Sequence, residues 1–318
     1  MTLSAADLRD RVLAGDRRAV ARAITVLERG GDDGAALHAL LYPHAGRALR
    51  LGVTGPPGAG KSTLVDRLAR ELHGDFSRLA VLAVDPSSPV THGALLGDRI
   101  RMGALQELPG VFVRSMASRG LLGGLGPAAL EVMDGLDAAG FDLVLVETVG
   151  VGQSELDVAF AADITLVVVA PGAGDGIQAL KAGLLEMADI VCVNKSDLGG
   201  AETVRNDLMA AFELSSARSE KAPAILLASS KTGEGVGALA ASVRELAGDE
   251  DFRIRFGERR RRAAQRRIVG GLQREAGHAA ERVLESDPVL VTSVVDGLMT
   301  PRAASHEVFR RILKGETS

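Results

Sequence analysis

The pattern of apolar and polar residues divides the chain into three regions. Residues 4–42 have the spacing of helices, with an apolar stripe along one side. The stripe consists of Ala19, Val20, Ala23, Ile24 and Leu27. Ser4 with Asp7 three residues later predicts the start of a helix, because a serine oxygen can accept an N–H of the first helical turn. We therefore predict a helical N-terminal extension over residues 1–46.

From residue 49 to about 248, short apolar runs alternate with longer amphipathic segments. The runs predict strands over 49–53, 79–84, 111–115, 142–146, 164–169, 189–193 and 224–227. Because helical segments separate most of these strands, we expect a mainly parallel sheet covered by helices, which is an α/β fold. Ligands of such sheets bind at the carboxyl ends of the strands. This domain is predicted to cover residues 47–248.

The C-terminal region, residues 249–318, is helical again, with an interruption at Asp287-Pro288. Its first part is rich in arginine: Arg253, Arg255, Arg259, Arg260, Arg261, Arg262, Arg266 and Arg267. We interpret these arginines as the solvated face of a long helix, able to pair with acidic residues of a partner subunit. A nucleic-acid patch is the alternative interpretation.

Composition narrows the class of protein. The 318-residue chain is 46% hydrophobic but only 3% aromatic, so its core must be mostly aliphatic. A net charge of −4 gives no electrostatic case for nucleic-acid or membrane binding. The lone Cys192 excludes a disulfide framework and a Cys-rich metal site. No apolar stretch approaches the roughly 18 residues of a membrane span, and residues 1–20 lack the core of a secretion signal. We expect a soluble, cytoplasmic protein with no nucleic-acid and no membrane partner.

A phosphate-binding loop follows the first predicted strand. It reads Gly55-Pro56-Pro57-Gly58-Ala59-Gly60-Lys61-Ser62-Thr63. In this G-x-x-x-x-G-K-[ST] pattern the glycines turn backbone N–H groups toward a polyphosphate, Lys61 brings a positive charge to the terminal phosphates, and Ser62 offers a hydroxyl to Mg²⁺. An apolar run precedes the loop and a helical pattern follows it, as the motif requires. The chain is therefore predicted to be a P-loop NTPase.

The segment Asn194-Lys195-Ser196-Asp197 directly follows another apolar run and favours guanine as the base. Asp197 can accept from both the ring N–H and the exocyclic amine of guanine, a pair that adenine cannot offer. Asn194 can bond the base edge and hold the loop, and the stem of Lys195 can lie against the base. A site built this way rejects a base that leaves its polar groups unpaired. Ser229-Ser230-Lys231, after the next strand, can add a backbone donor to the guanine carbonyl.

Three carboxylates and a glycine predict the Mg²⁺ and γ-phosphate side of the site. Glu147 ends an apolar run and can hold a magnesium-bound water, and Gly150 can offer its N–H to the γ-phosphate. Asp85 and Asp98 are expected at the same edge of the sheet. For Asp85, capping of a turn is the alternative role. We predict a GTPase that uses Mg²⁺ and binds GTP and GDP.

The position of the nearest glutamine predicts slow intrinsic hydrolysis. In many G proteins a glutamine directly follows the switch glycine and orients the attacking water. Here Val151 follows Gly150, and Gln153 comes two residues later. We expect a partner or a rearranged loop to complete the site.

Taken together, these motifs resemble the MeaB family, also called ArgK, of SIMIBI-type (metallochaperone-superfamily) GTPases. The supporting segments are residues 55–63, 84–89, 97–102, 147–155 and 194–197, of which 147–155 is the most specific. The resemblance covers essentially the whole chain and implies the P-loop fold with helical N- and C-terminal extensions. It further implies a homodimer joined by the C-terminal helices. Its implied client is adenosylcobalamin-dependent methylmalonyl-CoA mutase, with GTP gating cofactor loading and removal of damaged cofactor.

The resemblance also implies roles for particular residues. The Mg²⁺ ligands would be Ser62, Asp85, Asp98 and Glu147. A mobile loop thought to respond to the mutase corresponds to residues 171–181. The catalytic candidates are then Lys61, Asp98, Glu147, Gln178 and Lys181. His92-Gly93 departs from the Gly-Gly usual in the family and could alter the mobility of its loop.

Two other functions stay open. A nickel or zinc metallochaperone of the same superfamily would carry His-rich or Cys-x-Cys-Cys motifs, whereas this chain has six scattered histidines and Cys192 on a predicted strand. A kinase linked to amino-acid transport is an older label for relatives of the family. It would need a base for the phospho-acceptor and an adenine or permissive base site, whereas Asn194-Lys195-Ser196-Asp197 favours guanine.

Overall fold

The computed structural model describes residues 3–86, 105–118, 125–148, 154–172, 182–215 and 222–315. The chain forms two compact units, Met1–Arg260 and Arg261–Ser318, and the boundary falls inside one long helix. The predicted nucleotide motifs all belong to the first unit.

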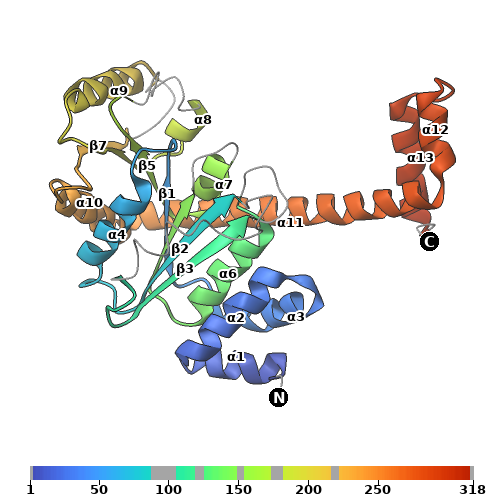
Figure 1. Ribbon diagram of the computed structural model, residues 1–318, viewed down its shortest axis with the longest axis horizontal. Coiled ribbons are helices and arrows are strands. Elements are labelled where there is room, and N and C mark those ends of the chain that lie inside the picture. The colour runs from blue at the N-terminus through green and yellow to red at the C-terminus, as the bar shows by residue number, and fades with distance from the viewer. Residues whose placement is uncertain are drawn as a thin grey trace. The chain divides into compact units, whose positions relative to one another are not determined.

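A seven-stranded parallel sheet forms the centre of the first unit (Figure 1). The strands are β1 (Leu49–Thr54), β2 (Leu79–Pro86), β3 (Val111–Ser118), β4 (Leu143–Thr148), β5 (Ile164–Val169), β6 (Ile190–Val193) and β7 (Ala224–Leu227). Their order is β3-β2-β4-β1-β5-β6-β7, and every neighbouring pair is parallel. The α/β prediction is confirmed, and each predicted run is a strand.

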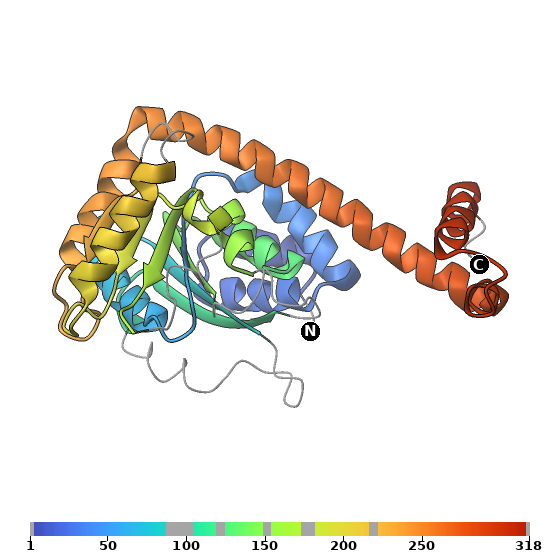
Figure 2. The ribbon, with the colours of Figure 1, turned by 90° about the horizontal axis from the view of Figure 1, so that it is seen from above.

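Helices cover both faces of this sheet (Figures 1 and 2). One face packs against α4 (Lys61–Leu72) and α10 (Val236–Gly248). The other packs against α6 (Pro127–Ala138), α7 (Ser154–Ala161), α8 (Ala182–Leu185) and α9 (Ala201–Ser215). Along β2, Leu79 and Val81 enter the first core, and Ala80 and Leu82 enter the second. Because both faces are covered, the strands are mostly apolar, and β5 and β6 are buried along their whole length.

The N-terminal region is helical, as predicted, but it consists of separate helices. These are α1 (Ala5–Leu13), α2 (Arg17–Arg29), α3 (Gly31–Leu41) and a 3₁₀ turn (Tyr42–His44). The breaks contain Gly15 and Gly30, both with positive φ. The predicted start is confirmed, since the Asp7 N–H donates to the Ser4 hydroxyl at 3.1 Å.

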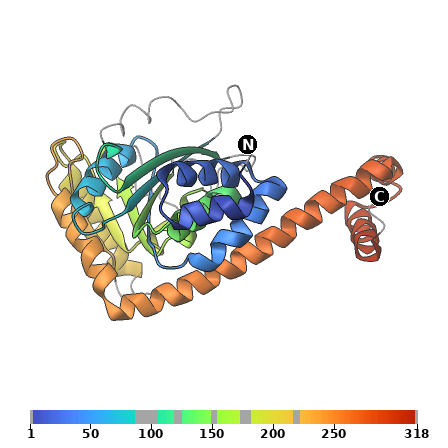
Figure 3. The same ribbon diagram turned by 90° about the horizontal axis from the view of Figure 1, so that it is seen from below.

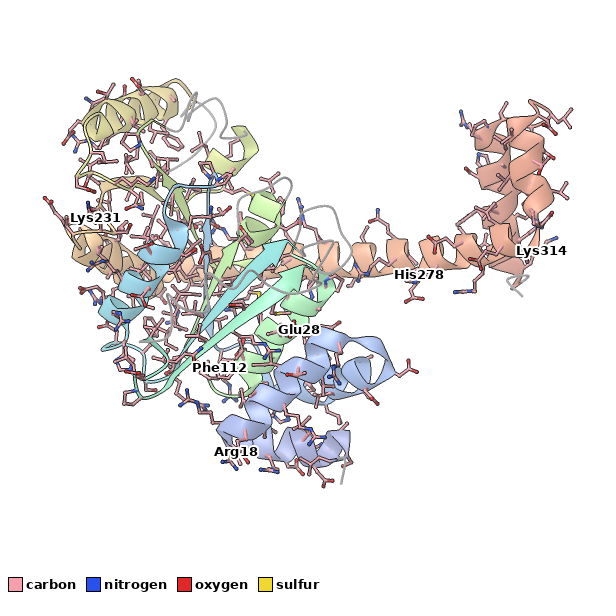
Figure 4. The ribbon with its side chains drawn as sticks, in the orientation of Figure 1. Arg18, Glu28, Phe112, Lys231, His278 and Lys314 are labelled. Atoms are coloured by element: carbon pink, nitrogen blue, oxygen red, sulfur yellow. The ribbon has the colours of Figure 1, made fainter. Side chains whose placement is uncertain are left out.

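The helices α2 and α3 pack against α6, and α1 packs against α2 and α3, as Figure 3 shows in blue and green. The predicted apolar stripe on α2 is buried there. At β3, the edge strand of the sheet, Arg114 donates to Glu28 of α2 at 2.5 Å. Figure 4 labels Glu28 on α2 and Phe112, another residue of β3.

Buried acidic residues of α6 hold the segment that leads into β1. Asp137 accepts hydrogen bonds from the three backbone N–H groups of residues 46–48. Arg50 donates to Asp134 at 2.9 Å and to Asp137 at 3.3 Å, and His38 of α3 lies 2.9 Å from Asp134. These contacts fix where β1 begins, and therefore where the loop after it lies.

The helix α11 (Glu250–Ser286) starts in the first unit. Phe252 is buried in the core beside α10. Arg259 forms an ion pair with Asp189 at 2.6 Å, and Arg260 forms one with Asp163 at 2.6 Å. Two of the arginines expected on a solvated helix face thus bind carboxylates of their own chain, at residues directly before β6 and β5.

The second unit contains the rest of α11 with α12 (Pro288–Val295) and α13 (Pro301–Lys314). Val283, Leu290 and Val308 form its small core. The break before α12 is as predicted: Asp287 accepts the N–H of Val289, and Pro288 occupies the first turn. Of the helices described, none has the length and hydrophobicity needed to cross a bilayer.

Candidate nucleotide-binding site

The predicted phosphate loop joins β1 to α4 at the carboxyl edge of the sheet, where neighbouring backbone approaches closely. Gly55 has φ +138°, and a Cβ there would lie 2.0 Å from the carbonyl oxygen of Val168 on β5. Gly60 has φ +90°, and a Cβ there would lie 2.4 Å from Nδ2 of Asn194. Both positions therefore require glycine, for conformation and for space.

Lys61 opens α4 and is buried. Its ammonium donates to the carbonyl of Gly55 at 2.8 Å and to that of Pro56 at 3.0 Å. The charge thus lies within the loop, where it could exchange these carbonyls for phosphate oxygens. The rest of the loop, Pro57, Gly58 and Ala59, precedes it, and Ser62 and Thr63 follow in the first helical turn.

Ser62 and Glu147 are brought together across the site. The Ser62 hydroxyl donates to Oε1 of Glu147, the penultimate residue of β4, at 2.6 Å. Val84 of β2 pairs with Thr148 of β4, so the backbone of Asp85 lies at the same sheet edge. A hydroxyl beside a carboxylate fits Mg²⁺, which prefers hard oxygen ligands. The side chain of Asp85 and all of Asp98 lie outside the described residues.

Asn194 connects the guanine motif to the phosphate loop. It follows β6, is fully buried, and donates through Nδ2 to the carbonyl of Ala59 at 2.8 Å. It also donates to the Ser230 hydroxyl at 3.1 Å and accepts the Ser230 N–H at 2.9 Å. One side chain therefore links three loops, those after β1, β6 and β7.

Asp197 and Ser229 link the two guanine segments. The Ser229 hydroxyl donates to Oδ1 of Asp197 at 2.6 Å. This hydrogen bond is the main cause that lowers the pKa of Asp197, and the charges of Lys231 and Lys195 lower it further. Asp197 is therefore an ionised acceptor at neutral pH, as recognition of two guanine donors would require.

The two lysines of the guanine segments, Lys195 and Lys231, are notable for different reasons: the first for its backbone conformation and the second for its exposure. Lys195 has φ +59°, and it is the one non-glycine residue with positive φ in the described part of the chain. Such a conformation costs energy and is often found at binding sites. Lys231 is exposed in the loop before α10, and its side chain extends outward in Figure 4.

A contact that the sequence did not predict comes from Arg67 of α4. Its Nε donates to the carbonyl of Ser230 at 2.5 Å, and its Nη2 donates to the carbonyl of Lys231 at 2.7 Å. Both acceptors are backbone atoms, so no residue type in the loop indicates this contact. An arginine six residues after Lys61 was the one available signal.

Several predicted residues lie outside the described ranges. They are Asp98, Gly150, Gln178 and Lys181, together with His92 and Gln153. Their proposed roles continue to rest on the sequence.

A phosphate loop after β1, bonded through Asn194 to a guanine motif on a parallel sheet, defines a P-loop GTPase. The chain belongs to the family described as Methylmalonyl Co-A mutase-associated GTPase MeaB, whose model matches residues 20–280. The resemblance inferred from the sequence is thereby confirmed.

Individual relatives are consistent with this family. The chain is 40% identical over 310 residues to a Pyrococcus horikoshii protein with a provisional GTPase name, covering 96% of this chain and 98% of that protein. It is 39% identical over 200 residues to the Mus musculus protein "Methylmalonic aciduria type A homolog, mitochondrial", covering 62% and 48%. A solved structure of a protein named "LAO/AO transport system kinase" has a TM-score of 0.68 and 26% identity over 98% of each chain.

Proposed function

We propose that this GTPase is a chaperone of adenosylcobalamin-dependent methylmalonyl-CoA mutase, with GTP gating the loading and protection of its cofactor. The observation that carries the proposal is the family match over residues 20–280, because the family description names association with that mutase. The mouse relative, named for methylmalonic aciduria, supports the same client.

The nucleotide would bind along the carboxyl edge of the sheet. In this proposal the loop of residues 55–63 surrounds the phosphates, and Lys61 neutralises their charge. The guanine contacts come from Asn194, Lys195, Asp197, Ser229, Ser230 and Lys231. The hydrogen bonds that already join these residues to one another and to the phosphate loop support the assignment.

Mg²⁺ would be held by Ser62, Asp85, Asp98 and Glu147, and it would supply charge stabilisation to the β- and γ-phosphates. The 2.6 Å contact between Ser62 and Glu147 supports two members of this set. Gly150 would donate its N–H to the γ-phosphate. Gln178 and Lys181 are proposed to act when the mutase binds, because the displaced Gln153 leaves the intrinsic site incomplete.

We also propose that the protein is a homodimer joined through its second unit. Apolar side chains of α11, α12 and α13 line a cavity of about 430 Å³ in that unit. Phe309, at the wall of this cavity, is 56% exposed, and Leu298 beyond α12 is 81% exposed. Apolar surface of this kind is typical of a protein interface.

Two other functions are less well supported. The protein in the similar solved structure is named as a transport system kinase, but the ionised Asp197 beside Asn194 favours guanine over adenine. For a nickel or zinc metallochaperone the one cysteine is unsuitable. Cys192 is buried in β6, and burial raises the pKa of its thiol to about 12, so it offers no thiolate to a metal.

The test is to measure binding of methylmalonyl-CoA mutase to the protein loaded with GDP or with a non-hydrolysable GTP analogue. We expect the two mutase affinities to differ by at least about fivefold, since a switch requires nucleotide states with different affinities for the partner. GTP turnover of the free protein should be on the order of 10⁻⁴ to 10⁻² per second and should rise when the mutase is added.

Asp197→Asn provides the matched control. The asparagine variant should lose its response to GTP analogues and respond instead to xanthosine analogues, because xanthine presents a carbonyl where guanine has an amine. Equal, negligible mutase binding in both nucleotide states would refute the chaperone function. If the free protein hydrolysed GTP as fast as a fully activated GTPase, the claim that its intrinsic site is incomplete would be wrong.

A further inference from the structure

The loop after β7 is closed on itself and held from outside by one arginine. The Ser229 N–H donates to the carbonyl of Glu234 at 2.9 Å, and the Gly233 N–H donates to that of Ser229 at 2.8 Å. These bonds leave Ser230 and Lys231 on the span between them. The carbonyls of these two residues accept from Nε and Nη2 of Arg67, at 2.5 and 2.7 Å.

The fit between Arg67 and this loop is close. A Cβ added to Gly233 would lie 2.9 Å from Nη1 of Arg67, so the loop backbone runs directly against the guanidinium group. A guanidinium is planar and presents its N–H donors in a fixed fork. Two consecutive carbonyls bound to one fork therefore have a defined orientation, and a lysine could not reproduce it.

Peptide geometry transmits this orientation to the far side of the loop. The peptide bonds of the described residues are all trans, so the C=O of Ser230 and the N–H of Lys231 point in opposite directions. Holding that carbonyl toward α4 turns the Lys231 N–H away from α4. The N–H of Ser230 is already accepted by Asn194. The Lys231 N–H is thus the oriented donor that the loop can present to a base.

We propose that Arg67 is a positioning residue for guanine recognition. By holding the carbonyls of Ser230 and Lys231 from the phosphate-loop helix, it orients the Lys231 N–H toward the 6-carbonyl of guanine. The inference rests on the proposed guanine site and adds to it a residue that does not touch the nucleotide. The orientation of the loop after β7 therefore depends on α4, the helix that begins at Lys61.

The experiment compares dissociation constants for GDP and for 6-thio-GDP, in which a weakly accepting sulfur replaces the 6-carbonyl oxygen. In Arg67→Ala, the affinity for GDP should fall about five- to tenfold, which is the effect of losing one hydrogen bond. The affinity for 6-thio-GDP should fall less than about twofold, because its sulfur accepts that hydrogen bond only weakly. The preference for GDP should therefore shrink. Arg67→Lys, which keeps the charge but not the fork, should be intermediate.

Arg70→Ala is the matched control, because Arg70 lies one turn further along the same helix and pairs with Asp66 at 3.0 Å. Its ratio of GDP to 6-thio-GDP affinity should equal that of the wild type. Equal losses for both nucleotides in Arg67→Ala, or an unchanged ratio, would overturn the proposal. If the alanine variant does not fold, the ratio in Arg67→Lys decides. Failure of Asp197→Asn to accept xanthosine nucleotides would count instead against the guanine site itself.

Discussion

At the scale of single residues, the contact between the phosphate loop and Asn194 of the guanine motif depends on one glycine. Gly60 has φ +90°, and an ideal Cβ at this position would lie 2.4 Å from Nδ2 of Asn194. That nitrogen donates to Ala59 and to Ser230. Any side chain at residue 60 must therefore displace the amide that connects the loops after β1, β6 and β7.

We predict that Gly60→Ala raises the dissociation constant of GDP at least about tenfold. Gly58→Ala is the control, because Gly58 also has a positive φ, +75°, but a Cβ there meets nothing within 4 Å. It shares the backbone penalty without the collision, and we expect an effect of at most about threefold. Calorimetric titration with GDP measures both. Equal losses in the two variants would contradict a role for the contact with Asn194.

The sequence indicates the residue types of this candidate site more readily than the contacts between them. The phosphate loop and Asn194-Lys195-Ser196-Asp197 are recognisable because their chemistry requires particular side chains at fixed spacing. The Arg67 contact was not predictable, because its acceptors are backbone carbonyls that any residue could provide. The bond between Ser62 and Glu147 joins residues 85 positions apart, which only the sheet topology brings together.

At the scale of elements, buried strands were easier to predict than helix boundaries. The runs at 164–169 and 224–227 match β5 and β7 at both ends, because strands of a parallel sheet are nearly continuous apolar runs. In β5 the one polar residue is the buried Thr165, and β7 is apolar throughout although it is only partly covered. The region 4–42 was predicted only as helical. The helices break at Gly15 and Gly30, which have positive φ and precede Asp16 and Gly31. Gly-Asp and Gly-Gly pairs are turn signals, but the apolar spacing continues across them and predicted helix throughout.

The start of α11 also shows what the sequence leaves open. Its arginines were expected to lie on a solvated face, able to pair with a partner subunit. In the structure the Arg260 guanidinium donates to Asp163, whose side chain is 1% exposed, and to the carbonyl of Ala48 at 2.9 Å. The bond to Asp163 raises the pKa of Arg260, so its guanidinium is charged at neutral pH. This arginine attaches α11 to the segments before β1 and β5.

We predict that Arg260→Ala lowers the free energy of unfolding by about 3 kcal/mol, since it leaves the buried Asp163 charge without its ionic partner. Arg244→Ala is the comparison, because Arg244 pairs with Asp75 at the surface, and exposed pairs contribute less than about 1 kcal/mol. Urea unfolding curves of the two variants measure both values. Similar small losses would show that Arg260 is not an anchor of α11.

At the scale of the whole molecule, the two compact units differ in what they can do. The first contains every described residue of the nucleotide site, and the second contains none. The second has a small core, Val283, Leu290 and Val308, beside exposed apolar side chains on α11, α12 and α13. Three helices that bury so little apolar surface are stabilised when another protein surface covers their exposed apolar side chains. This is the physical argument for a second copy of the chain as the partner of this unit.

We therefore predict a particle of twice the 33.0 kDa chain mass in light scattering. Phe309→Glu should raise the dissociation constant of the dimer at least about a hundredfold, because a charge would be buried where an aromatic anchor was lost. Phe309 is 56% exposed in the single chain, so the variant should still fold. Met209→Glu, a similar change at a 46% exposed position of α9, should stay dimeric. A wild type that is monomeric at micromolar concentration, or equal dissociation in both variants, would exclude the second unit as the dimer interface.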